Sequence, residues 1–173
     1  GGTKVSEKLR KILLDSQNDS ITPMTEMLLY MAARAQLVNE IILPALKKGK
    51  IIICDRFLDS TIAYQGYGLG IGIKLIKCAG EFATSGIKPG LTIFLDLPIR
   101  KGLKHRQQSK DRIEKRSLAY HSRVLEGYLK LADLQPKRIK MVKVYKDKNK
   151  TQKKIRELVE SFLKSNIKNQ ISK

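Results

Sequence analysis

The stretch "DRFLDSTIAYQGYGLGIG", residues 55–72, follows directly on the apolar run Ile-Ile-Ile-Cys at 51–54. That run is β-branched and compact, and it predicts a buried strand over 50–54. In parallel α/β sheets, ligands bind beyond the carboxyl ends of the strands. The charged pair that ends this strand, Asp55 and Arg56, therefore supplies the first candidate functional residues.

Helices and short strands are predicted to alternate along the whole chain. Apolar periodicity predicts helices over 5–14, from Thr22-Pro23 to a kink or end at Pro44, over 73–84, over 117–134 and over about 155–163. Compact apolar runs predict further strands over 91–97 and 139–145, the first of them buried. This alternation favours an α/β fold with a parallel sheet covered by helices on both faces, in a single domain over residues 1–173.

The charge of the chain is large and uneven. The net charge is +19, with 12 Lys and Arg against 9 Asp and Glu in residues 1–99 and 23 against 7 in residues 100–173. Such an excess attracts polyanions, but we favour solvated basic helix faces as the explanation for most of these residues, since they are interleaved with a regular apolar pattern. No apolar run reaches the roughly 18 residues of a membrane span, and no signal peptide is evident, so we expect a cytoplasmic protein without a membrane partner. The two cysteines, Cys54 and Cys78, are expected to be buried thiols.

The residue types in the opening stretch suggest phosphate chemistry. A carboxylate such as Asp55 just past a strand is a pattern by which phosphoryl-transfer enzymes hold Mg²⁺, although a simple turn cap gives the same pattern. The forked guanidinium of Arg56 suits a phosphate. The glycines at 66, 68, 70 and 72 fit neither G-x-G-x-x-G nor G-x-x-x-x-G-K-[ST]. We therefore interpret them as a flexible connection.

The whole string "DRFLDSTIAYQGYGLG" closely resembles the DR[YF]-x-x-S-x-x-AYQG-x-G signature of thymidylate kinases. Four more stretches resemble that family in the same order: "GGTKVSEKLRKILL", "TEMLLYMAARAQLVNEIILPAL", "EFATSGIKPGLTIFLDLP" and "DRIE", the last from the lid of the bacterial type. The resemblance covers residues 1–135. It implies a P-loop kinase-like fold and transfer of the ATP γ-phosphoryl group to dTMP, giving dTDP.

The resemblance also implies a dTMP pocket. Its residues would be Tyr30 stacked on thymine, Arg34 at a thymine carbonyl, Arg56 on the 5′-phosphate, Thr61 at the N3 edge of the base, and Tyr64 and Gln65 at the sugar. The ring of Tyr64 would exclude a ribose 2′-hydroxyl. Three of these roles have an ordinary alternative: a core aromatic for Tyr30, a surface ion pair for Arg34 and a helix cap for Thr61.

The same resemblance assigns the catalytic cations and the metal. Asp55 would hold Mg²⁺ through water, and ATP would be the co-substrate. A lid over residues 104–116 would carry Lys104, Arg106, Lys110 and Arg112, with Arg106 and Arg112 stabilising the charge of the transferring phosphoryl group. A solvated basic loop is the alternative for each of these residues. Adenine contacts are expected near 146–150, and homodimerisation through helices 24–47 and 73–84.

The sequence departs from the family at its start. The first strand, the G-x-x-x-x-G-K-[ST] loop, the helix after it and the second strand with its R-E-P motif are absent from the 173 residues. We therefore expect the sequence to begin within the natural protein, and we expect unpaired strand edges. An upstream reading frame encoding the loop would support this, and a start codon at Gly1 would contradict it. The alternative function is an inactive remnant that binds nucleotides or nucleic acid through its basic C-terminal half. Another nucleoside monophosphate kinase is a third possibility.

Overall fold

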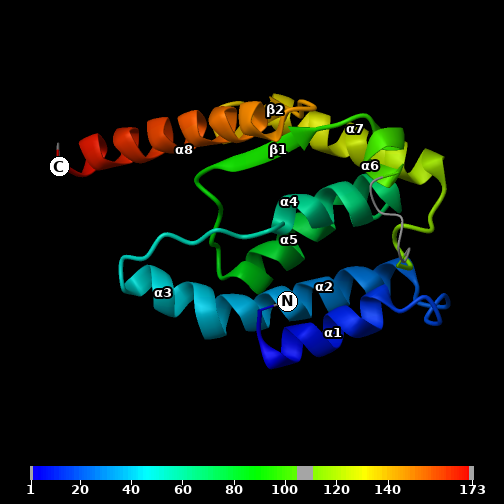
Figure 1. Ribbon diagram of the computed structural model, residues 1–173. Coiled ribbons are helices and arrows are strands. Elements are labelled where there is room, and N and C mark those ends of the chain that lie inside the picture. Colours follow the sequence, from blue (N-terminus) through cyan, green and yellow to red (C-terminus); the bar gives the residue numbers. More distant parts are fainter. Residues whose placement is uncertain (1, 105–110, 172–173) are drawn as a thin grey trace.

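The computed structural model describes residues 2–104 and 111–171, and Figure 1 shows their arrangement. The elements are α1 (Lys4–Leu14), α2 (Pro23–Leu37), the π-helical turn η1 (Val38–Ile42), α3 (Leu43–Lys47), α4 (Leu58–Thr61), the π-helical turn η2 (Ile62–Gly68), α5 (Ile73–Thr84), β1 (Thr92–Asp96), α6 (Ile99–Lys104), α7 (Leu118–Leu134), β2 (Ile139–Lys143) and α8 (Lys148–Ile171). Helices α1 to α3 lie along one side, α4 and α5 lie in the middle, and the strands lie with α7 and α8 on the opposite side (Figure 1). The α/β class is confirmed.

Local capping signals place the helix starts correctly. The Thr22 hydroxyl accepts a hydrogen bond from the backbone N–H of Thr25, and Pro23 occupies the first turn of α2. At α1, Thr3 and Ser6 satisfy each other's backbone donors in a capping box. Helix α5 ends where Ser85 and Gly86 adopt positive φ, the left-handed exit that the glycine predicts. These helices were predictable because each signal lies within a few residues.

Pro44 does not end the second helix. The chain passes through η1, where the N–H of Leu43 donates to the carbonyl of Val38, and continues as α3 to Lys47. A proline lacks the N–H that would bond to the carbonyl four residues earlier, and a π-helical turn is one way in which a helix accommodates such a defect. The helix therefore runs one turn past the proline.

The parallel sheet is confirmed, but it has two strands rather than three among the described residues. β1 pairs with β2 in parallel, with Thr92 opposite Ile139 and Asp96 opposite Lys143. Its burial is incomplete, since Leu95 is 49% exposed and Met141 45% exposed. The predictions of a buried β1 and of a sheet covered on both faces are therefore too strong.

The predicted strand over 50–54 is wrong. These residues form no regular structure, and Ile53 is 94% exposed. A strand requires a neighbour to accept and donate its backbone hydrogen bonds, and neither strand of the described sheet pairs with this segment. Cys54 is exposed for the same reason, and Cys78 is exposed on α5, so the prediction of buried thiols is also wrong.

The main core joins the middle helices to the flanking ones. Its buried members are Met27, Met31, Ile62, Ile76, Ala83, Leu131, Ala132 and Ile139. Gly66 and Gly68 contribute close packing rather than flexibility, because both are buried in η2. A Cβ atom on Gly68 would lie 2.6 Å from a ring carbon of Tyr120. The flexible connection predicted for the glycines is therefore wrong at 66 and 68.

None of the helices in the described part of the chain is long and apolar enough to cross a membrane.

Candidate functional site

Arg56 and Tyr64 face each other at the start of the site. Asp55 and Arg56 form an exposed bend after the unpaired 51–54 segment, and the Arg56 guanidinium lies 5.0 Å from the centre of the Tyr64 ring. Arg56 has φ of 71°, in the left-handed region that residues other than glycine seldom adopt. Such a backbone costs roughly 1–3 kcal/mol and is enriched at functional sites. The bend therefore places Arg56 over the ring of Tyr64, the second residue of the AYQG step.

Arg34 and Thr61, predicted to contact the same base, lie together. An Arg34 Nη2–H donates to the Thr61 hydroxyl at 2.8 Å and to the carbonyl of Phe57 at 3.2 Å. Burial lowers the pKa of Arg34 to about 10, while the nearby Asp59 acts to raise it. Arg34 bonds to a hydroxyl and to a backbone carbonyl, and not to a carboxylate, so these bonds do not match the surface ion pair considered as its alternative role. Its remaining guanidinium N–H groups can donate to a ligand carbonyl.

Tyr30 lies one helical turn before Arg34 on α2 and is half-buried. Burial raises the pKa of its phenol, and the neighbouring carboxylate of Glu26 raises that pKa further. Tyr30 therefore stays neutral at physiological pH. A neutral, partly exposed ring beside Arg34 is chemically suited to stacking on a base.

Three tyrosines surround the sugar side of the predicted pocket. Tyr64 meets Tyr120 and Tyr128 of α7 edge to face, each at 6.3 Å between ring centres. The Tyr128 hydroxyl and the Ser60 hydroxyl share a 2.7 Å hydrogen bond, and the Tyr128 ring stacks on Phe94 of β1. These edge-to-face contacts restrict the orientation of the Tyr64 ring.

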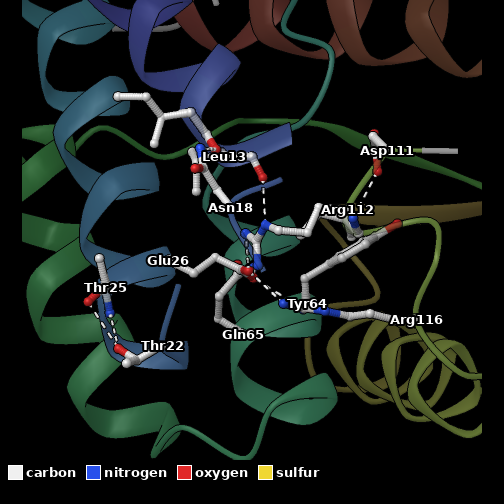
Figure 2. Close-up of polar contacts among 12 residues, drawn as sticks. Leu13, Asn18, Thr22, Thr25, Glu26, Tyr64, Gln65, Asp111, Arg112 and Arg116 are labelled. Atoms are coloured by element: carbon white, nitrogen blue, oxygen red, sulfur yellow. Dashed lines mark hydrogen bonds and ion pairs between the residues drawn. The ribbon is translucent and has the colours of Figure 1, made fainter. Parts of the chain in front are cut away.

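Gln65 and Arg112 lie against a residue that the sequence reasoning missed. Glu26 is fully buried at 0% exposure, and it accepts a 2.8 Å hydrogen bond from the Gln65 amide. Arg112 forms a 2.5 Å ion pair with the same carboxylate (Figure 2) and is 8% exposed. Its Nε–H also donates to the carbonyl of Leu13. Such burial and pairing favour a structural role for Arg112 over that of an exposed catalytic cation.

Arg116 completes the cluster around Glu26. One Nη–H group of Arg116 donates to a Glu26 oxygen at 2.6 Å and another donates to the Tyr120 hydroxyl at 2.9 Å. A buried carboxylate needs such partners, because an unpaired charge in the interior is costly. The sequence signal that was available is a glutamate directly before the core residue Met27, on the helix that also carries Tyr30.

A second ion pair joins the opening stretch to the sheet. Arg138 grips both oxygens of Asp59, with two N–O distances of 2.8 Å, and also donates to the Thr92 hydroxyl. Asp59 and Arg138 are 79 positions apart. This bidentate pair fixes α4, which carries Thr61, to β1 and β2.

The remaining predicted lid residues are not located. Arg106 and Lys110 lie outside the described residues, and so does the side chain of Lys104.

The Asp55 carboxylate is compatible with a magnesium site. Mg²⁺ keeps several waters and usually takes only one or two protein carboxylates together with substrate phosphates. Asp55 is exposed beside Arg56, as such a ligand must be. Within residues 2–104 and 111–171, no set of three or more His, Cys, Asp or Glu side chains is grouped for a metal.

Together these side chains have the chemistry that a phosphorylated planar ligand would need. A guanidinium and a neutral ring suited to a base, Arg34 and Tyr30, lie on α2. A guanidinium suited to a phosphate, that of Arg56, lies over the ring of Tyr64. This division suits a nucleoside monophosphate.

Comparisons with known proteins agree with this chemistry. A family model described as thymidylate kinase matches residues 1–155. The thymidylate kinase of Thermoanaerobacter sp. (strain X514) is 47% identical over 164 residues, which cover 94% of this chain and 80% of that protein. That of Kosmotoga olearia is 48% identical over 144 residues, covering 82% of this chain and 69% of that protein. The crystal structure of thymidylate kinase from Ehrlichia chaffeensis superposes with a TM-score of 0.73 at 28% identity, covering 92% of this chain and 76% of that one.

Proposed function

The chain belongs to the thymidylate kinase family, and from that premise we propose that Tyr30, Arg34, Thr61 and Tyr64 form an acceptor site for dTMP. The protein is a phosphotransferase that phosphorylates dTMP. The observation that carries the proposed site is the hydrogen bond between Arg34 and Thr61, which brings together two residues expected at the same base. The comparisons give no support to the inactive nucleic-acid-binding remnant.

The reaction that we propose is transfer of the γ-phosphoryl group of ATP to a phosphate oxygen of dTMP. A new P–O bond forms on dTMP, the bond to the ADP leaving group breaks, and dTDP and ADP result. Arg56 holds the 5′-phosphate in line by bridging two of its oxygens. Mg²⁺, held through water by Asp55, supplies charge neutralisation when bound. By resemblance, Arg106 stabilises the charge that spreads over the transferring group, and Lys104 and Lys110 belong to the same lid.

Selection of the nucleoside is assigned to three side chains. Arg34 donates to the 4-carbonyl of thymine, where cytosine would present an amino group that is itself a donor. Tyr30 stacks on the base. The Tyr64 ring occupies the space that a ribose 2′-hydroxyl would need. Gln65 is predicted at the sugar by resemblance, although its amide also bonds to Glu26.

We also propose a cytoplasmic homodimer that associates through α2 and α5. Several large apolar side chains are exposed on these helices, among them Leu28, Leu75 and Phe82, and Phe82 is 89% exposed. Exposed apolar patches are typical of protein interfaces. Phe82→Lys should therefore give a monomer in light scattering, whereas an unchanged mass would contradict this interface.

Turnover tests the proposed function. The full-length protein should release ADP from ATP in the presence of Mg²⁺ and dTMP, with dUMP slower and dCMP slower still. Equal rates with dTMP and dCMP would contradict the assignment of Arg34, and no ADP release with any of them would contradict the reaction.

A further inference from the structure

A buried carboxylate that takes no part in the proposed reaction is connected to Tyr64 by two routes. Glu26 lies on α2, and its oxygens accept hydrogen bonds from Gln65, Arg112 and Arg116 (Figure 2). These partners come from η2 and from the segment before α7, which are distant from α2 in the sequence. Two of them continue to Tyr64.

The first route is the neighbouring residue in the chain. The Gln65 Nε2–H donates to a Glu26 oxygen at 2.8 Å, and both side chains are buried. Gln65 follows Tyr64 in the π-helical turn η2, so this bond fixes the rotation of that turn. Replacing the carboxylate by an amide would leave Gln65, Arg112 and Arg116 competing for one acceptor oxygen, and a buried donor without a partner favours rearrangement of the turn.

The second route passes through α7. Arg116 bonds both Glu26 oxygens, at 2.6 and 3.2 Å, and donates to the Tyr120 hydroxyl at 2.9 Å. That hydroxyl in turn donates to the carbonyl of Tyr64 at 3.4 Å, and the two rings meet edge to face. Glu26 therefore holds both the backbone turn of Tyr64 and the ring against which Tyr64 packs.

We propose that Glu26 is a positioning residue for sugar specificity, which keeps the Tyr64 ring where it excludes a ribose 2′-hydroxyl. This inference rests on the proposed function, because it presupposes that dTMP binds with its sugar at Tyr64. Glu26 itself touches no substrate. Without it, Tyr64 remains aromatic and present, but its ring can move aside to admit the hydroxyl.

The test is the preference of the full-length protein for dTMP over ribothymidine 5′-monophosphate, measured as the ratio of the two kcat/KM values. Glu26→Gln should lower this ratio about tenfold, which corresponds to about 1.4 kcal/mol of discrimination. Most of the change should come from faster use of the ribonucleotide. A uniform loss of activity on both substrates, with the ratio unchanged, would overturn the inference.

Asp59→Asn is the matched control, because it also disrupts a buried carboxylate pair, with Arg138, that has no bond to Tyr64 or Gln65. Its ratio should stay at the wild-type value. An equal fall in this variant would mean general loosening and would overturn the inference.

Tyr120→Phe provides a second variant if Glu26→Gln does not fold. It keeps the ring and removes only the hydroxyl that links Arg116 to Tyr64, so a lowered ratio supports the inference and an unchanged ratio overturns it. A wild-type protein that does not phosphorylate dTMP would instead overturn the proposed function.

Discussion

Arg34 of α2 donates a 2.8 Å hydrogen bond to the hydroxyl of Thr61 in α4, across 27 positions of the sequence. This bond joins the helix that carries Tyr30 to the stretch that carries Arg56 and Tyr64. It also sets the direction of the guanidinium, since Phe57 accepts from the same nitrogen. The orientation of Arg34 at the proposed base end of the site therefore depends on the Thr61 hydroxyl.

Thr61→Val should weaken binding of dTMP without unfolding the protein. The substitution keeps the β-branched shape and removes the acceptor for Arg34, and a hydrogen bond to a charged group contributes about 1.5–3 kcal/mol. We expect the dissociation constant of dTMP to rise at least about tenfold by calorimetric titration. Thr61→Ser, which retains the hydroxyl, should stay within a few-fold of wild type. Equal binding by the Val variant would remove Thr61 from the site.

Arg56→Lys should impair turnover although it keeps the charge. An ammonium cannot bridge two phosphate oxygens as a guanidinium does, so we expect kcat/KM for dTMP to fall by a factor of about ten or more. Arg156→Lys on the exposed face of α8 is the matched control and should have no effect. If both variants behave alike, the assignment of Arg56 to the phosphate is wrong.

Gly68→Ala should destabilise the fold. Its Cβ would lie 2.6 Å from Tyr120 and 2.9 Å from Val124, both on α7. Overpacking of this kind costs typically about 1–3 kcal/mol, measurable as a lower midpoint in urea. Gly102→Ala is the control, because its Cβ would meet only Leu97, at an ordinary contact distance of 3.7 Å. Equal midpoints for the two variants would mean that α7 moves away without cost.

Tyr128 should make stability fall at alkaline pH. Burial raises the pKa of its phenol to about 12 from 10.0, while Arg56 and Ser60 act to lower it. The unfolded chain therefore releases this proton first, so its contribution is fully present below pH 10 and is lost as the pH rises through 12. Tyr128→Phe should show a shallower loss of unfolding free energy between pH 9.5 and about 11.5 than wild type. Parallel curves for the two proteins would contradict the burial of this phenol.

The sequence predicted the elements whose signals are local. Thr22 and Gly86 mark helix ends within a turn of the residues that they cap, and the runs at 91–97 and 139–145 are strands. The strand predicted over 50–54 is wrong because a strand forms only beside a neighbouring strand, and no local sequence pattern shows whether that neighbour exists. The same reasoning applies to the site. Glu26 pairs with Arg112 and Arg116 across 86 and 90 positions, and ion pairs of that separation leave no periodic trace.

The candidate residues were available mainly from the resemblance. Composition and periodicity singled out Asp55 and Arg56, which follow an apolar run. Composition and periodicity gave no reason to connect Arg34 with Thr61, or Tyr64 with α7, because those contacts arise from the packing of helices. Arg112, predicted as a catalytic cation of the lid, is paired with Glu26 in the interior, a contact that the resemblance did not indicate.

The most direct test of the account is calorimetric titration of the full-length protein with dTMP and with dCMP, in wild type and in Arg34→Met. Wild type should bind dTMP more tightly than dCMP by about tenfold or more, because Arg34 faces a carbonyl in one base and an amino group in the other. The variant should bind both with similar, weaker affinity. Equal affinities in wild type, or a preference that survives in Arg34→Met, would contradict a thymine site at Arg34 and Thr61.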